Sequence, residues 1–438
     1  MSSAGPSQPA PYTPPPAGQP HGAPQPSASP PAYTAQQYSQ SSYTPPRFAQ
    51  QPYASVLAQP TPYSPPAPAA PSPAAGLPAL PPARRAGGRT TLFILFGVLG
   101  LLLLGLIGYF GLALGVMPSV VGLVLALFPL AGVFAVVRMI DRWEPEPRLL
   151  LLFAVAWGAI AAVGLTLLVD IGLVLLLGRP VDEVTGAVVQ APVVEEFWKG
   201  LGVLLVFLIA RRSFDGPVDG VVYGALVGAG FAFTENIQYF AVSLIEGGEG
   251  QLTTTFILRA VMSPFAHAMF TSLTGLAIGL AARRQASAGG AIGYALLGML
   301  GAMLLHALWN GSSFADFFLL YFVLQVPLFV GFVVGILALR REEARLTRAR
   351  LGDYAAAGWF TPEEVTMLAT PAGRKVGLAW AAQLRGDRRP LMREFIRDAT
   401  ALAAVRQRAI TGRDPLAPAE EQALLIRTRA TRAALLAY

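Results

Sequence analysis

The 438-residue sequence has no cysteine, only three histidines and few charged residues. The absence of cysteine excludes disulfides, thiolate metal ligands, a cysteine nucleophile and lipidation on cysteine. Charged residues make up 13% of the chain, whereas soluble domains carry about 25%. Hydrophobic residues make up 54%. This composition argues against a water-soluble enzyme and predicts a membrane protein with several spans.

Lysine is also scarce, because 30 of the 32 basic residues are arginine. The formal net charge is +7, and the arginines gather at the ends of apolar segments and in the last hundred residues. This distribution is typical of membrane orientation rather than of a nucleic-acid-binding patch. We therefore expect a lipid bilayer and no nucleic acid as partner.

The composition divides the chain into three regions. Residues 1–90 contain 24 of the 38 prolines, with repeated tyrosine, glutamine and serine, and such a segment buries too little apolar surface to offset its ordering entropy. We predict a disordered cytoplasmic tail there. Residues 91–340 hold the apolar segments, and residues 341–438 return to frequent charge with apolar residues at helical spacing. That last region predicts a small helical cytoplasmic domain, in which Thr361, Pro362 and Glu364 form a capping-box pattern.

Eight apolar stretches are each long enough to cross about 30 Å of hydrocarbon. Because backbone polar groups in lipid must be paired internally, they predict an all-α bundle of about eight transmembrane helices. Their limits are 91–115, 119–140, 149–177, 186–210, 218–244, 255–282, 290–311 and 315–339.

Arginine also sets the expected orientation, because cytoplasmic connections carry the excess of basic residues. Alternate connections are rich in arginine, and the opposite ones carry Arg179 and Arg259 with several acids. Both termini are therefore predicted to be cytoplasmic. The arginines of the cytoplasmic side are Arg84, Arg85, Arg89, Arg138, Arg142, Arg148, Arg211, Arg212, Arg283, Arg284, Arg340 and Arg341.

Ionisable residues inside a predicted span are costly and mark candidate functional sites. Glu195, Glu196 and Lys199 lie in the fourth span. Lys199 is four residues after one glutamate and three after the other, so its ammonium reaches either carboxylate on one helix face. A buried ion pair for helix packing needs only one glutamate. The second carboxylate predicts a general base.

The fifth span adds a third carboxylate, Glu235, followed by Asn236. Gly224, Gly228 and Gly230 precede them with a spacing that lets helices approach closely. A hydrogen-bonded acid between two helices is the alternative interpretation of Glu235. Asp219, at the start of this span, is predicted to cap the helix, and Asp170 in the third span either faces a polar cavity or caps a break.

Two of the three histidines, His267 and His306, lie in the sixth and seventh spans. Pro264 predicts a bend just before His267, and Asn310 shares a helix face with His306. A single buried histidine is often only a hydrogen-bonding partner between helices. Counted from the outer helix ends at about 1.5 Å per residue, however, the histidines and carboxylates all fall in the outer half of the membrane. They predict one polar cavity that opens outward.

These motifs resemble the PrsW-type intramembrane proteases, within the larger group that contains the CAAX prenyl endopeptidases. The resemblance covers about residues 130–340. It leaves both terminal regions unexplained. The matching pieces are Asp141-Arg142 with Glu144-Pro145-Glu146-Pro147, Glu195-Glu196-x-x-Lys199, Asp219-Gly220, Phe231-x-x-x-Glu235-Asn236, His267 and His306-x-x-x-Asn310.

The resemblance implies hydrolysis of a peptide bond in or beside the membrane segment of a membrane protein, such as a single-pass anti-sigma factor. It places the chain in a bacterial plasma membrane as a multi-pass protein. Glu195 would be the base that activates water, with Glu196 and Lys199 adjusting its charge. Glu235 and His267 would orient the water, with Asn236 in support, and His306 with Asn310 would stabilise the oxyanion.

The cofactor stays open at this point. In one mechanism a divalent metal such as zinc, held by His267, His306 and Glu195, activates the water. In the other, glutamate and histidine act without metal, which the related prenyl endopeptidases favour. Spacing does not decide between them, because the candidate ligands come from separate helices.

Two other classes of protein account for buried charges. A proton-coupled transporter would use buried glutamate, lysine and histidine as a relay, but the chain has no second copy of the Glu-Glu-x-x-Lys motif. A non-catalytic membrane scaffold would keep the polar residues for helix association. The protease interpretation explains more of the motifs than either.

Overall fold

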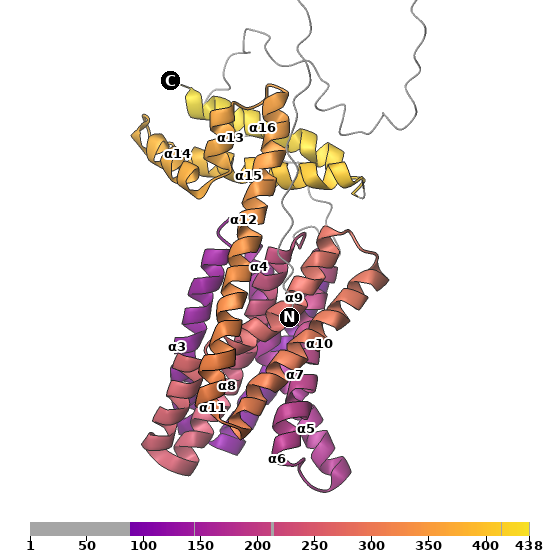
Figure 1. Cartoon of the computed structure of the whole chain (residues 1–438), viewed down its shortest axis with the longest axis vertical. Coiled ribbons are helices and arrows are strands. Elements are labelled where there is room, and N and C mark those ends of the chain that lie inside the picture. Colours follow the sequence, from indigo (N-terminus) through magenta and orange to yellow (C-terminus); the bar gives the residue numbers. More distant parts are fainter. Residues whose placement is uncertain (1–87, 144, 212–213, 413, 438) are drawn as a thin grey trace, which may run out of the picture. The chain divides into compact units, whose positions relative to one another are not determined.

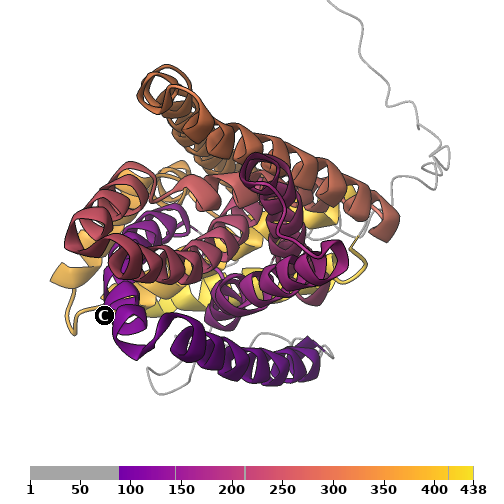
Figure 2. The same ribbon diagram turned by 90° about the horizontal axis from the view of Figure 1, so that it is seen from below.

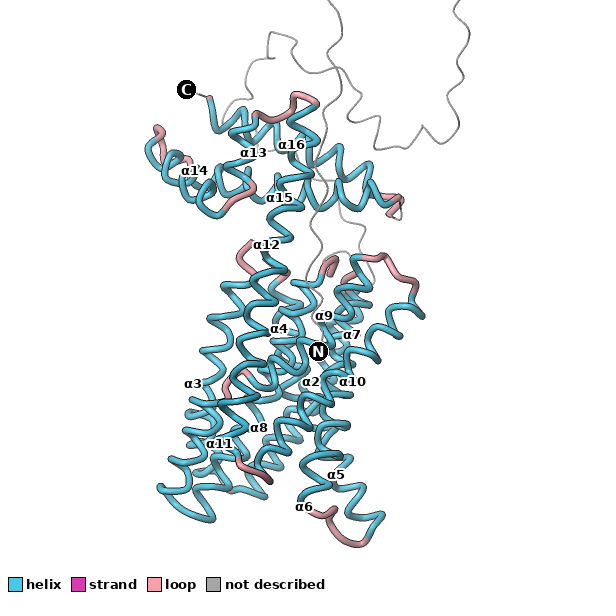
Figure 3. The backbone as a smooth tube through the Cα atoms, in the orientation of Figure 1, coloured by secondary structure: helices cyan, strands magenta, loops and turns pink. Residues whose placement is uncertain are grey.

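The computed structural model describes residues 88–143, 145–211, 214–412 and 414–437, and within these ranges the chain forms helices joined by loops, without strands (Figure 3). The all-helical prediction is therefore confirmed for the described part of the chain. Except for residues 88–90, the predicted disordered tail lies outside the described residues, as do Glu144 and Arg212.

The first half of the helical region runs from α2 to α7, and several of its helices continue directly into π-helical segments. The N-terminal helix α2 lies at the edge of the group in Figure 2, as the darkest indigo ribbon. The elements are α2 (Gly88–Tyr109), η2 (Phe110–Leu114), α3 (Val116–Ile140), α4 (Arg148–Ala156), η3 (Trp157–Ala162), α5 (Val163–Leu177), α6 (Glu183–Thr185), η4 (Gly186–Gln190) and α7 (Ala191–Ile209).

The second half supplies the central helix α8 and its neighbours (Figure 1). A break at residues 263–265 separates the two helical segments on either side of Pro264, so the predicted bend is a full interruption. The elements are α8 (Pro217–Phe256), η5 (Ile257–Met262), α9 (Ala266–Arg283), α10 (Ala288–Gly311), η6 (Ser312–Phe314), α11 (Phe317–Leu320), η7 (Tyr321–Gln325) and α12 (Val326–Ala356).

Six helical stretches in the described part of the chain are long and apolar enough to cross a membrane. One of them, Pro217–Arg283, runs for 67 residues and contains two of the predicted spans. Helix α7 is not among the six; its 19 residues include three charged side chains. A count of eight spans therefore stays a prediction, while six helical stretches of the described chain have the length and composition of membrane spans.

The outer surface of these helices is apolar. Leu101 and Leu112 on the first span are 72% and 92% exposed, and Leu175 and Leu176 on α5 are about as exposed. Contiguous apolar surface of this extent is incompatible with water and is covered by lipid in membrane proteins.

Close contact of α8 with its neighbours depends on glycine. A Cβ atom built at Gly224 would lie 2.7 Å from the carbonyl oxygen of Thr271, and one at Gly228 would lie 2.3 Å from that of His267. Gly230 faces the other way, where a Cβ would lie 2.2 Å from the carbonyl oxygen of Val155. The predicted close approach at these glycines is confirmed, and it places α8 between α9 and α4.

Two predicted helix starts are also confirmed. The carboxylate of Asp219 accepts hydrogen bonds from the backbone N–H groups of Asp215 and Gly216, both at 2.9 Å, at the beginning of α8. Thr361 and Glu364 form the reciprocal capping box of α13 (Pro362–Leu368). Both arrangements pair backbone donors that a helix start leaves free.

The C-terminal region has a hydrophobic core of its own. Helix α12 continues to Ala356, so the predicted boundary at residue 340 falls inside a continuous helix. Large residues from α12, α15 and α16 form this core, among them Leu351, Tyr354, Phe395 and Leu424. The remaining elements are α13 (Pro362–Leu368), α14 (Pro371–Gln383), α15 (Arg389–Thr411) and α16 (Ala417–Leu436).

Candidate active site

Helix α7 carries two carboxylates and the ammonium group between them. Lys199 Nζ lies 3.0 Å from Glu195 Oε2 and 2.8 Å from Glu196 Oε1, as the helical spacing predicts. All three side chains are buried. The ammonium also lies 3.8 Å from the ring centroid of Phe231 on α8, which adds a cation–π contact. Two carboxylates within about one helix turn therefore share a single positively charged partner.

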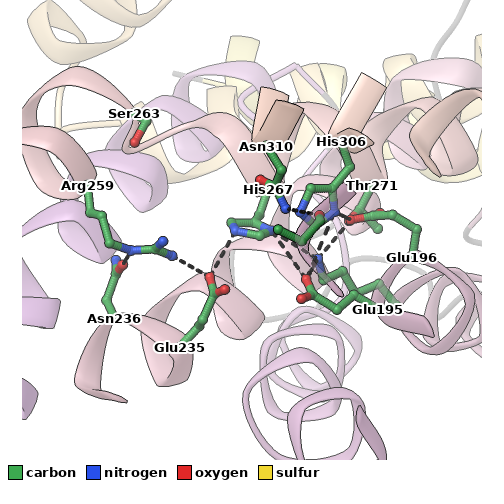
Figure 4. A network of polar contacts seen from close by, with 12 residues as sticks. Glu195, Glu196, Glu235, Asn236, Arg259, Ser263, His267, Thr271, His306 and Asn310 are labelled. Carbon is green, nitrogen blue, oxygen red and sulfur yellow. Dashed lines mark hydrogen bonds and ion pairs between the residues drawn. The ribbon is translucent and has the colours of Figure 1, made fainter. Parts of the chain in front are cut away.

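His267 joins this cluster from the first turn of α9, directly after the helix break. Its Nδ1 lies 2.9 Å from Lys199 Nζ, and its Nε2 lies 2.9 Å from Glu235 Oε2. The ring thus links the α7 cluster to the carboxylate on α8 (Figure 4). Because the backbone of His267 rests against Gly228, the position of the ring is set by the contact between α8 and α9.

Glu196 is the most enclosed carboxylate of the group. Its Oε1 lies 3.1 Å from His306 Nδ1 on α10, and its Oε2 accepts a hydrogen bond of 3.0 Å from Thr271 Oγ1. With Lys199, this gives it three partners. Thr271 is a site residue that sequence reasoning missed, although it lies four residues after His267 and so shares its helix face.

Arg259 is a second residue that sequence reasoning missed. The distribution of arginine predicts an outer connection for Arg259, but η5 places its guanidinium against the carboxylate of Glu235, and its Nε donates a 2.6 Å hydrogen bond to Asn236 Oδ1. The guanidinium carbon also lies 3.8 Å from the ring centroid of Tyr239. The signal was available, because an arginine inside a predicted span requires an acidic partner.

Asn310 is one turn from His306 but has a different partner. Its Nδ2 donates a 2.9 Å hydrogen bond to the carbonyl oxygen of Ala187 in η4. This bond ties α10 to the segment that leads into α7. The Asn310 amide therefore connects two of the segments that position the site residues.

A cavity of about 350 Å³ opens beside the cluster. Glu195 and Glu235 line it from α7 and α8, and Tyr239 lies at its wall, 46% exposed. Asp170 on α5 also lines it and accepts a 2.7 Å hydrogen bond from Gln190 Nε2. Of the two interpretations of Asp170, the structure supports the one in which it faces the cavity.

The fold and the site together define a helical membrane protein in which carboxylates, histidines and a lysine from four helices meet beside a cavity. Residues 146–333 match the model of a family described as PrsW family intramembrane metalloprotease. The resemblance predicted from the motifs is therefore confirmed, because this part of the chain matches the PrsW family model.

Relatives that match part of the chain are named after the same family. "Protease PrsW" of Geobacillus kaustophilus is 37% identical over 95 residues, which is 22% of this chain and 38% of the relative. "Protease PrsW" of Clostridioides difficile is 31% identical over 153 residues, or 34% of this chain and 62% of the relative. The matches thus span less than two thirds of these relatives. No solved structure matches the chain.

The matched family is described as a metalloprotease family, and the carboxylates and imidazoles of the site are donor types that bind metal ions. One ligand atom each from Glu195, Glu196, His267 and His306 lies within 4.8 Å of the others, and glutamate and histidine are zinc ligands.

Lys199 occupies the space between these donors. Its ammonium contacts Glu195, Glu196 and the Nδ1 atom of His267 at 2.8–3.0 Å. A divalent ion among the same atoms would compete for these contacts and would be repelled by the ammonium charge. The arrangement around Lys199 therefore does not fit a metal ion.

Proposed function

We propose that this chain is an intramembrane endopeptidase that hydrolyses a peptide bond in or next to the membrane segment of a membrane protein. The observation that carries the proposal is the position of Glu195, which belongs to the buried cluster and also lines the cavity. A substrate in the cavity would meet a carboxylate already placed by an adjacent cation.

The two adjacent glutamates have different surroundings, and this difference supports different roles for them. Both oxygens of Glu196 have protein partners, Lys199 and His306 at one and Thr271 at the other. Glu195 meets Lys199 through Oε2 and faces the cavity. We assign Glu195 as the general base and Glu196 as the residue that positions Lys199 and His306.

The reaction needs one proton to move twice. Glu195 takes a proton from a water molecule, and the water oxygen bonds to the carbonyl carbon of the scissile peptide. The C–N bond then breaks, and the proton passes from Glu195 to the departing amine nitrogen. The products are a carboxylic acid and an amine, with no oxidant or reductant required.

The other polar residues have supporting roles in this proposal. Glu235 and His267, which are 2.9 Å apart, orient the water at the cavity wall. We assign His306, whose Nδ1 lies 3.9 Å from Glu195 Oε2, to stabilising the oxyanion. Asn236 and Arg259 hold Glu235, and Asn310 positions η4.

We further propose a location in the bacterial plasma membrane, with eight spans and both termini in the cytoplasm. The bacterial relatives and the apolar helices support this location. A single-pass membrane protein such as an anti-sigma factor is the proposed substrate.

The test compares membrane proteomes of cells that carry wild type, Glu195→Gln or Glu249→Gln, with labelling of new protein N-termini. Glu249 is an exposed acid on α8 and is the matched control. We expect new termini near single-pass segments in the wild type and the control and their loss with Glu195→Gln. Identical termini in all three strains, with each protein inserted, would reject proteolysis.

A second measurement tests whether Lys199, and not a metal ion, lies at the centre of the cluster. Elemental analysis of the purified wild-type protein should find no stoichiometric divalent metal, and chelators should leave hydrolysis unchanged. One equivalent of zinc that disappears with Glu195→Gln would contradict the assignment of Lys199 to the centre of the cluster.

A further inference from the structure

The cavity beside Glu195 extends beyond the residues that the proposed reaction uses. Part of its wall comes from α5 and carries Thr166 and Asp170, which are four residues apart and so share one helix face. The apolar side chains of Val163, Leu167 and Val242 also line the cavity. This cavity, which is lined by α5, α7 and α8, is referred to below as the groove between α5 and α8, and it contains the proposed catalytic carboxylates as well as the two polar groups of α5.

Thr166 is the unusual member of this wall. It is 8% exposed, and its Oγ1 has no hydrogen-bond partner in the described part of the chain. A threonine inside a helix often bonds to the carbonyl oxygen one turn earlier. A buried hydroxyl without a partner is costly, so it calls for an explanation outside the helix itself.

Asp170 lies one turn further along α5, and a partner holds it in place. Gln190 Nε2 donates to its Oδ1 at 2.7 Å, which fixes the carboxylate at the groove. A carboxylate has about four acceptor positions, so one such bond leaves capacity for further N–H donors. Thr166 and Asp170 together provide a hydroxyl and a carboxylate along about one helix turn.

A membrane-spanning substrate needs such groups at the point of cleavage. Inside lipid its backbone N–H and C=O groups are paired within its own helix, which also shields each peptide bond. Hydrolysis requires the helix to unwind locally, and each freed backbone group in an apolar environment then lacks a partner. A protein surface that supplies partners beside the general base lowers this cost.

We propose that the groove between α5 and α8 binds an unwound, extended stretch of a membrane-spanning peptide, and that Thr166 and Asp170 are positioning residues that pair with its freed backbone groups. The inference rests on the proposed function and names the form in which that site takes its substrate. Leu167 and Val242 accommodate apolar side chains of the same stretch.

The absence of cysteine makes the groove testable by disulfide crosslinking, because an introduced cysteine is the only one in the chain. Full-length Glu195→Gln protein in liposomes would carry a cysteine at Leu167, at Val242 or, as control, at Val334, which is 57% exposed on α12. The probe is a lysine-flanked leucine–alanine transmembrane peptide of about 20 residues. It holds one cysteine next to a central Gly-Gly pair, and a matched peptide has Leu-Leu instead.

We expect the Gly-Gly peptide to crosslink at Leu167→Cys and Val242→Cys about fivefold more than at Val334→Cys, and more than the Leu-Leu peptide does. Equal yields at all three positions, or equal yields for both peptides, would overturn the proposal.

Two substitutions test the hydroxyl itself. Thr166→Val keeps the side-chain shape and removes the hydroxyl, whereas Thr166→Ser keeps the hydroxyl. We expect Thr166→Val to lower the crosslink about fivefold without lowering thermal stability, since the hydroxyl has no hydrogen-bond partner among the described residues. Thr166→Ser should crosslink like the parent protein. Full crosslinking in Thr166→Val would exclude Thr166 from peptide binding.

The crosslink is formed in a protein that cannot turn over, so it is independent of hydrolysis. Specific crosslinks together with unchanged N-termini in cells would reject the proposed peptidase and support the binding groove. Hydrolysis that Glu195→Gln abolishes, without specific crosslinks, would support the peptidase and reject the groove.

Discussion

Gly228 lies where α8 touches the backbone of α9, and its replacement by alanine tests how the site is positioned. The new Cβ would lie 2.3 Å from the carbonyl oxygen of His267, whereas Cβ atoms essentially never approach other atoms closer than 3.0 Å. The neighbouring atom is backbone, so it has no rotamer by which to move away. The two helices must therefore separate here by about 0.7 Å.

This displacement acts on the residue that links the two halves of the site. Both ring nitrogens of His267 make contacts of 2.9 Å, to Lys199 and to Glu235. If the ring moves by the whole shift, both contacts lengthen to about 3.6 Å, which is outside hydrogen-bonding range. A misplacement of about 1 Å can cost about 100-fold in rate, so we expect Gly228→Ala to lose about 100-fold in hydrolysis.

The assay is cleavage of the substrate found by N-terminal labelling, with purified protein in liposomes. The matched control is Gly132→Ala on α3, where a Cβ would meet nothing within 4 Å. Overpacking costs about 1–3 kcal/mol, partly offset by about 1 kcal/mol of helix propensity, so Gly228→Ala should still fold. Activity of Gly228→Ala within about twofold of Gly132→Ala would refute the reasoning.

Three further predictions concern stability. Lys199→Met leaves two buried carboxylates without their cation and should lower the free energy of unfolding by about 3 kcal/mol. The double variant Lys199→Met/Glu196→Gln should recover part of this stability. An unchanged melting temperature in detergent would contradict this. Thr361→Ala removes the cap of α13 and should lower the free energy of unfolding by about 1 kcal/mol, measured by urea unfolding of the full chain. Thr361→Ser should match wild type. An equal loss of stability in both variants would contradict the capping role of Thr361. Burial raises the pKa of Asp141 from 3.8 to about 6, so its contribution to stability is complete below pH 3.8 and is lost as pH rises through about 6. Asp141→Asn should therefore flatten the stability–pH curve between these values and be the more stable protein above pH 6, and parallel curves would be inconsistent with that pKa.

The sequence by itself determined the features that depend on local spacing and composition. The apolar runs define membrane helices, because lipid leaves no other way to pair backbone groups. The contact of Lys199 with both glutamates follows from helical geometry alone. The capping box at Thr361 and the break beside Pro264 are equally local, since each depends on residues within one turn.

Only the tertiary structure decided how the helices are rotated against each other, because that depends on contacts between distant segments. It set Glu195 at the cavity and Glu196 in the interior, although the two are adjacent in sequence. It brought Arg259 to Glu235 through a π-helical segment, which no periodic pattern predicts. It also placed Thr166 and Asp170 of α5 in the lining of the same cavity as Glu195 of α7 and Glu235 of α8, although these residues are far apart in the sequence.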